Sequence, residues 1–138
     1  MKRFELLDIS GDAGIRAFGE ELDDLFRNAA AGMYSLITDP ENITPQKSIE
    51  ITAAGESLEG LLVSWLNELI FHFDAYGFIG REIRIRELHD TQLKARVTGE
   101  DFAPERHGGG LLIKAATYHK LKIERKEGHW EADVIFDI

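Results

Sequence analysis

Cysteine is absent from this 138-residue chain, proline occurs only three times, and no long apolar run is present. Without cysteine there is no disulfide, no thiolate zinc site and no cysteine nucleophile, and a reducing compartment, the cytoplasm, is the expected location. No apolar run approaches the ~20 residues that cross a membrane. The opening residues also lack the apolar segment of a signal peptide. We therefore expect a cytoplasmic protein without membrane contact.

Positive charge is also scarce, with 16 lysines and arginines against 25 acidic residues and a formal net charge of -9. Such a surface repels phosphate backbones and anionic membranes. Hydrophobic residues make up 43% and charged residues 30%, as in ordinary globular domains. The composition predicts a single folded domain that does not bind nucleic acid on its own.

Two segments repeat apolar residues at offsets typical of one helix face. The first stripe runs from Leu22 to Met33, follows a cluster of acidic residues, and is expected to end before Asp39-Pro40. The second runs from Leu58 to Leu69, with Ser57 as N-cap and Gly77 beyond its end.

Most of the remaining chain alternates apolar and polar residues with the period of a strand. Strands are predicted around 13–17, 49–53, 83–85, 93–97, 111–113, 121–124 and 130–136, with a turn at 125–128. The fold class is therefore α+β, with two main helices packed on largely antiparallel sheet. Each half reads as strand, helix, then strands, so we predict one domain, 1–138, made of duplicated strand-helix-strand-strand modules with approximate repeats 1–54 and 55–138.

Oxygen-bearing residues gather near both ends of the chain. The segment 8–12 places Asp8, Ser10 and Asp12 at alternate positions, a pattern that suits Ca²⁺ or Mg²⁺. An EF-hand is excluded because the required glycine and glutamate positions hold other residues, and turn or helix-cap use is the alternative. Asp137 precedes Ile138, whose free carboxylate adds a second acid, and a solvated strand end is the alternative there.

Other chemical motifs are missing. The five histidines lack zinc-ligand spacing, and no serine lies in a G-x-S-x-G elbow. His107-Gly108-Gly109-Gly110 lacks the ending of a phosphate loop and is predicted to form a flexible turn or contact loop. Arginines and lysines between 81 and 96 form either a solvated face or a phosphate-binding one.

Several segments, read together, resemble the archease family over essentially the whole chain. The family opens with D-H-T-A-D, then an I-R-A-Y-G-like strand, a helix beginning L-E-E-L-F and an M-T-D ending. Its second helix carries L-L-x-x-W-L-x-E-L, and its most specific stretch is a lone His, I-K-A-V-T-Y-H and a terminal V-I-F-D-I. The matching segments here are Asp8-Ile9-Ser10-Gly11-Asp12, Ile15-Arg16-Ala17-Phe18-Gly19, Leu22-Asp23-Asp24-Leu25-Phe26, Ile37-Thr38-Asp39, Leu61-Leu62 with Trp65-Leu66-Asn67-Glu68-Leu69, His107, Ile113-Lys114-Ala115-Ala116-Thr117-Tyr118-His119 and Val134-Ile135-Phe136-Asp137-Ile138.

This resemblance implies a non-enzymatic role in tRNA splicing. Archeases activate the GTP-dependent RNA ligase that joins tRNA halves, by promoting guanylylation of the ligase and multiple turnover. The implied partner is that ligase, and contact with tRNA would be indirect, through it.

The resemblance also implies a metal site. The family ligands correspond to Asp12, Asp137 and the carboxylate of Ile138, and the expected cofactor is a divalent metal ion, Ca²⁺ first, with Mg²⁺ or Mn²⁺ as alternatives. Residues at further motif positions are expected to shape the contact surface with the ligase: His107, Lys114, Thr117 and His119. The histidine of the opening motif is replaced by Ile9, so any role of that histidine does not transfer.

Two other functions remain open at this point. A metal-dependent phosphohydrolase could use the same carboxylates to activate water. A chaperone-like interaction module could hold the metal for structural reasons only, in which case metal removal would cost the fold.

Overall fold

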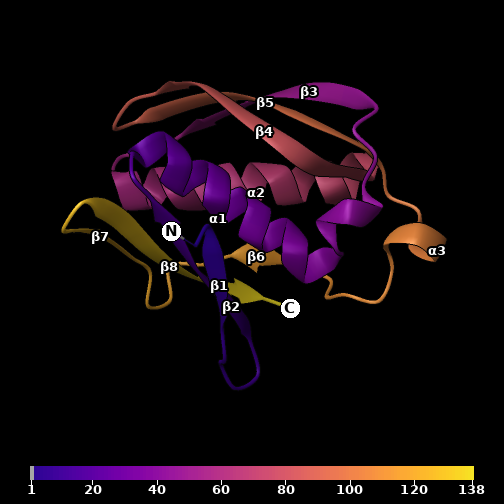
Figure 1. Ribbon diagram of the computed structural model, residues 1–138, viewed down its shortest axis with the longest axis horizontal. Helices are drawn as coiled ribbons and strands as arrows, with labels where there is room; N and C mark the ends of the chain where they lie inside the picture. The colour runs from indigo at the N-terminus through magenta and orange to yellow at the C-terminus, as the bar shows by residue number, and fades with distance from the viewer. Residues whose placement is uncertain (1) are drawn as a thin grey trace.

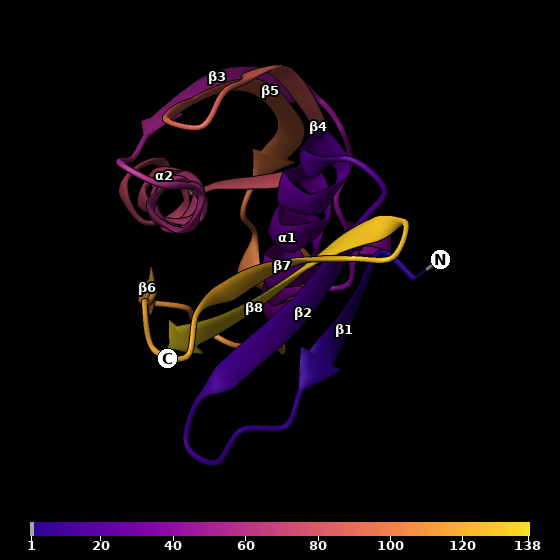
Figure 2. The ribbon, with the colours of Figure 1, turned by 90° about the vertical axis from the view of Figure 1, so that its left-hand side faces the viewer.

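The computed structural model describes residues 2–138 as two antiparallel sheets with two long helices between them (Figures 1 and 2). One sheet has the order β1-β2-β8-β6, with β7 also paired to β8, and the other has the order β3-β5-β4. In chain order the elements are β1 (Phe4–Leu7), β2 (Ala13–Gly19), α1 (Leu22–Ile37), the 3-10 turn η1 (Pro40–Asn42), β3 (Lys47–Ala54), α2 (Leu58–Tyr76), β4 (Phe78–Leu88), β5 (Gln92–Asp101), α3 (Pro104–His107), β6 (Ala115–Ala116), β7 (Lys122–Lys126) and β8 (His129–Asp137).

Both long helices form where the apolar stripes predict them. The Ser57 hydroxyl accepts a hydrogen bond from the Gly60 N–H at 3.0 Å, so it caps the start of α2. Gly77 ends the same helix with φ +67°, a left-handed conformation that favours glycine. The predicted α+β class, with two main helices on antiparallel sheet, is confirmed.

The helices share one core with both sheets. Trp65 on α2 is fully buried, and its indole N–H donates to the carbonyl oxygen of Phe26 on α1 at 3.0 Å. This bond satisfies the polar atom of the largest buried side chain and joins the two helices at the centre of the molecule. Among the described residues, no helix is both long and apolar enough to cross a membrane.

The two predicted repeats, 1–54 and 55–138, do not pack as separate units. Strand β3 of the first repeat pairs with β5 of the second, and β8 of the second pairs with β2 of the first. One sheet is built from consecutive strands, whereas the other joins the two ends of the chain. A boundary at residue 54 therefore does not separate two packing units, and the duplication itself stays a prediction.

The segment from 104 to 116 differs from the prediction. Residues 104–107 form the short helix α3, and 111–113 are not a strand. The Leu111 N–H instead donates to the Leu36 carbonyl oxygen at 2.8 Å, which ties the segment to the end of α1. At Gly110 an added Cβ would lie 2.1 Å from the Ile37 carbonyl oxygen, so glycine permits this close approach. The backbone of this segment contacts a helix end, which strand periodicity does not reveal.

The close approach of the paired strands β4 and β5 can be tested by substituting two glycines. At Gly99 an added Cβ would lie 1.9 Å from the Ile79 carbonyl oxygen of the neighbouring strand, whereas at Gly60 on α2 the nearest atom is 3.4 Å away. We expect Gly99→Ala to lower the free energy of unfolding by about 2 kcal/mol or more. Gly60→Ala should raise it by up to about 1 kcal/mol, because alanine favours the helix. Denaturant unfolding measures both, and equal stability of Gly99→Ala and wild type would contradict the close strand approach.

Candidate functional site

The pairing of β2 with β8 brings the acidic segments from the two ends of the chain together. The ladder begins with Ala13 opposite Phe136. Asp12 directly precedes Ala13 and Asp137 directly follows Phe136, so the two aspartates are the next residues beyond this pair at the same end of the sheet. In Figures 1 and 2 the β1–β2 loop projects from the body, and the C-terminus ends close to β6.

The donor chemistry at this end of the sheet fits a hard divalent cation. Asp137 and Ile138 are exposed and Asp12 is partly exposed, so their oxygens can reach an ion from solvent. Within residues 2–138, no three His, Asp or Glu side chains gather at a point that could hold a metal. Asp12 and Asp137 supply carboxylate oxygens, which Ca²⁺, Mg²⁺ and Mn²⁺ prefer, but within the described residues no third acidic side chain gathers with them.

The segment before β7 runs beside the same end of β8. The Lys114 N–H donates to the Asp137 carbonyl oxygen at 2.8 Å, and the Thr117 N–H and hydroxyl both donate to the Ile135 carbonyl oxygen, at 3.0 and 2.8 Å. The Thr117 hydroxyl also accepts from the His119 N–H at 3.2 Å. Two of the predicted contact residues, Lys114 and Thr117, thus bond to the strand that ends in Asp137, and His119 is joined to them through Thr117.

Asn67 on α2 positions this segment, a role that the sequence analysis does not predict. Its side-chain amide pairs with the backbone of Ala116: Oδ1 accepts from the N–H at 2.8 Å and Nδ2 donates to the carbonyl oxygen at 3.3 Å. The amide thereby replaces the strand neighbour that the two-residue β6 lacks on this side. A polar residue in a helix is ordinary in sequence, and only the register of β6 shows its partner.

The fourth predicted contact residue, His107, is fully buried. Its Nδ1 accepts from the Ala103 N–H at 2.8 Å, so Nε2 carries the proton and donates to the Glu100 carboxylate at 2.9 Å. Glu100 also accepts from the Thr44 N–H at 2.6 Å and pairs with Arg106. This placement does not bring His107 to the surface with the other three, and gives it a structural role in holding α3 against residues 43–44.

Ile9, which stands where the family motif has histidine, packs on the sheet. An added Cβ at Gly14 would lie 2.8 Å from the Ile9 Cδ1, so the isoleucine occupies the space over that glycine. Together with Ile135 it lines a shallow cavity of about 240 Å³ that also contacts Lys120 and Asp133. In this chain the position contributes apolar contact to the β1–β2 loop.

The same sheet also holds a charged pair that the sequence analysis does not predict. Arg16 lies opposite Asp133 in the β2–β8 ladder and donates to both carboxylate oxygens, at 2.7 and 3.0 Å. The hydrogen bond and charge of Asp133 raise the pKa of Arg16. Strand alternation places each residue on a polar face, but only the register between distant strands makes them partners.

The fold and this carboxylate-bearing end define a class: two-sheet α+β proteins whose second and last strands pair, so that acidic segments from near both ends of the chain lie at one end of the sheet. Residues 4–138 match the family model described as the archease protein family (MTH1598/TM1083). The chain is 33% identical to protein archease of Methanosarcina mazei, over 99% of this chain and 97% of that one. It is 34% identical to protein archease of Pyrococcus furiosus, over 100% of both chains.

Solved structures agree with these sequence matches. The solution structure of protein 1598 of Methanobacterium thermoautotrophicum is 33% identical and superposes with a TM-score of 0.79 over 100% of both chains. A crystal structure from Thermotoga maritima, described as an archease and possible chaperone, has a TM-score of 0.65 at 22% identity, over 96% of this chain and 94% of that one, and shows the shared fold. The chain belongs to the archease family, as its motifs predict.

Ionised Glu100 and its hydrogen-bond partners make the fold more stable at neutral pH than at acidic pH. The N–H of Thr44, the His107 ring and Arg106 hold the pKa of Glu100 below its ordinary value. A lowered carboxylate pKa contributes stability that is fully present above the unfolded value of about 4.3 and is lost as the pH falls through the folded pKa. We therefore expect the stability difference between wild type and Glu100→Gln to be largest near neutral pH and to shrink below about pH 4.

Thermal unfolding followed by circular dichroism across this pH range measures the difference. The matched control is Glu105→Gln, which removes an exposed carboxylate from α3 and should follow wild type at every pH. A difference between wild type and Glu100→Gln that stays constant down to pH 3 would show that ionisation of Glu100 does not stabilise the fold.

Proposed function

We propose that this protein is a metal-binding, non-catalytic activator of the GTP-dependent RNA ligase of tRNA splicing, which promotes guanylylation and multiple turnover of that ligase in the cytoplasm. Membership of the archease family supports this function. The observation that supports it is the β2–β8 register, whose last pair is Ala13 with Phe136, so that Asp12 and Asp137 are the next residues beyond it at the same end of the sheet.

The proposed metal ligands are the carboxylates of Asp12, Asp137 and Ile138. Three carboxylates at one point repel one another, and a divalent cation removes that repulsion. Ca²⁺ is the first candidate, with Mg²⁺ and Mn²⁺ as alternatives. When bound, the ion would offset most of the negative charge of the three carboxylates, and it could accept a further oxygen ligand from a partner.

The proposed contact surface follows the segment before β7, which bonds to this end of β8 through Lys114 and Thr117. It consists of Lys114, Thr117 and His119, together with two exposed apolar side chains of the same segment: Leu112 is 70% and Tyr118 66% exposed. Large exposed apolar side chains beside charged groups are typical of surfaces that bind proteins. The buried His107 is not part of this surface.

The net charge of -9 suits a partner that itself binds RNA. A ligase that holds tRNA halves needs a basic cleft, and opposite charges accelerate the encounter of two proteins. The chain would then reach RNA only through the ligase, which reconciles its acidity with a role in RNA processing.

Substitution of the two aspartates tests the metal site. We expect Asp12→Asn and Asp137→Asn each to weaken Ca²⁺ binding about tenfold or more, since each removes a charged ligand. Both should also slow multiple-turnover ligation by the cognate ligase with GTP. The control is Asp90→Asn, an exposed residue in the turn between β4 and β5 of the other sheet. Full activation by both site variants would show that these carboxylates are not the functional site.

The main-chain ligand has its own test. Extending the chain by one glycine after Ile138 moves the free carboxylate away from its proposed position. We expect weaker Ca²⁺ binding by calorimetry, with an unchanged melting temperature in metal-free buffer, because the extension touches no core residue. Unchanged Ca²⁺ affinity would remove Ile138 from the ligand set. Nucleotide hydrolysis by the purified protein without ligase, lost in Asp12→Asn, would favour the phosphohydrolase alternative instead.

A further inference from the structure

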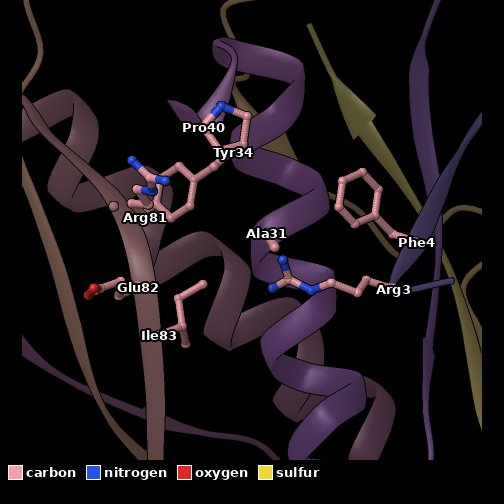
Figure 3. A pocket seen from close by; sticks show the side chains of 9 residues that line it. Arg3, Phe4, Ala31, Tyr34, Pro40, Arg81, Glu82 and Ile83 are labelled. Atoms are coloured by element: carbon pink, nitrogen blue, oxygen red, sulfur yellow. The ribbon is translucent and has the colours of Figure 1, made fainter. Parts of the chain in front are cut away.

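A second concave site lies at the other end of β1 from the loop that carries Asp12. It is a pocket of about 440 Å³ between the residues that enter β1, the middle of α1 and the first residues of β4 (Figure 3). Its volume falls within the range of pockets that bind small molecules, about 300–1,000 Å³. Phe4, Ala31 and Ile83 give it an apolar part, and two arginines give it a charged part.

The two arginines come from opposite walls. Figure 3 shows Arg3 extending over α1 toward Ala31, whereas Arg81 comes from β4 on the far side of the helix. Each is held by one hydrogen bond: Arg3 Nε donates to the Asn28 Oδ1 at 3.0 Å, and Arg81 Nη1 donates to the Ile43 carbonyl oxygen at 2.9 Å. These bonds orient each guanidinium and leave most of its five N–H donors available.

Neither arginine has a carboxylate partner. Throughout residues 2–138, the ion pairs of the chain involve other cations. Glu82 also lines the pocket, but its carboxylate points away from α1 in Figure 3. In a protein with an excess of nine negative charges, two uncompensated guanidiniums facing one pocket form a local anion-attracting site.

The backbone of β4 is irregular at this pocket. Its pairing with β5 shifts between Gly80 and Glu82, so Arg81 is the extra residue of a β-bulge. Bulges interrupt the alternation of a strand and redirect a side chain, and they are common beside binding sites. The bulge is an observation independent of the charges, and it falls on one of the two arginines.

A buried hydroxyl without a partner lines the same pocket. Tyr34 on α1 is 2% exposed, and within the described residues its hydroxyl makes no hydrogen bond. The hydroxyl lies against Gly80, where an added Cβ would be 3.1 Å from it. Burial raises the pKa of Tyr34, opposed in part by the nearby Gly80 backbone, which lies short of good hydrogen-bond geometry, so the hydroxyl stays neutral and can donate. A buried polar group left unpaired costs stability. A ligand oxygen that accepts a hydrogen bond from the Tyr34 hydroxyl would recover that cost.

We propose that this pocket binds a small phosphomonoester, with the phosphate between Arg3 and Arg81 and the apolar part of the ligand against Phe4, Ala31 and Ile83. Two guanidiniums match the charge of a phosphomonoester, about -1.5 to -2 at neutral pH, better than that of a single carboxylate. This binding is separate from the proposed metal site, since it uses none of the same residues.

Phenyl phosphate is a suitable probe, with benzoate and phenol as matched comparisons that carry a smaller charge or none. Titration followed by heteronuclear NMR should show saturable shifts at Arg3, Ala31 and Arg81 with phenyl phosphate. Benzoate should bind several-fold more weakly, and phenol should give no saturable shift. Addition of salt should weaken phenyl phosphate binding, because the attraction is electrostatic.

Variants assign the binding to the two arginines. Arg3→Gln and Arg81→Gln should each weaken phenyl phosphate binding about tenfold, as expected for loss of a charged hydrogen-bond donor. Tyr34→Phe should also weaken it, while keeping or raising the melting temperature because the hydroxyl is unpaired. The control is Arg84→Gln, an exposed arginine of β4 outside this pocket, which should bind like wild type.

The experiment uses the protein without ligase or metal, so its result is independent of the proposed activator function. Absence of saturable binding up to about 10 mM phenyl phosphate would overturn the proposal. This concentration is about ten times the dissociation constant of a weak specific ligand, about 1 mM. Equal weakening by Arg84→Gln and Arg81→Gln would overturn it as well, because the binding would then follow the general charge of β4.

Discussion

The pairing of β8 with β2 is the constraint on which the rest of this molecule depends. It joins one of the first strands of the chain to the last and places β8 in the interior of its sheet, with β6 and β7 sharing its other edge. The groups of the proposed metal-binding end lie on this ladder, directly beyond it, or beside it through the hydrogen bonds that Thr117 and Lys114 donate to β8. A shift of the register by one residue would exchange the buried and exposed faces of β8 and separate Asp12 from Asp137.

The helical layer makes this pairing part of a single core. Both sheets bury their inner faces on α1 and α2, and the Trp65 hydrogen bond to the Phe26 carbonyl holds the helices together. Because the acidic end of the sheet lies at the margin of this core, its residues can remain exposed to solvent while their backbone is fixed by buried neighbours. Such an arrangement suits a group that must be presented to another molecule in a defined geometry.

Charge is distributed unevenly over the two ends of β1. The loop beyond its last residue carries Asp12, one of the acids proposed to hold a metal, whereas the residues that enter it bring Arg3 to a pocket shared with Arg81. Both features rely on side chains that lack partners of opposite charge within the described residues, and both therefore favour ligands from outside the chain. The buried Glu100–His107 pair is different, because its polar atoms are satisfied internally and serve the fold.

Local sequence patterns were sufficient to predict much of this protein's fold. Helical stripes with Ser57 and Gly77 at the ends of α2, alternation in the longer strands, and motifs spread over the whole chain determined the fold class and the family, because each depends on neighbouring residues or on segments read in order. Tertiary structure alone decided which residues meet: Arg16 with Asp133, Asn67 with the backbone of Ala116, His107 with Glu100, and Arg3 with Arg81 around one pocket. Such pairs depend on strand register and helix packing between distant segments, and single-sequence periodicity contains no information on either.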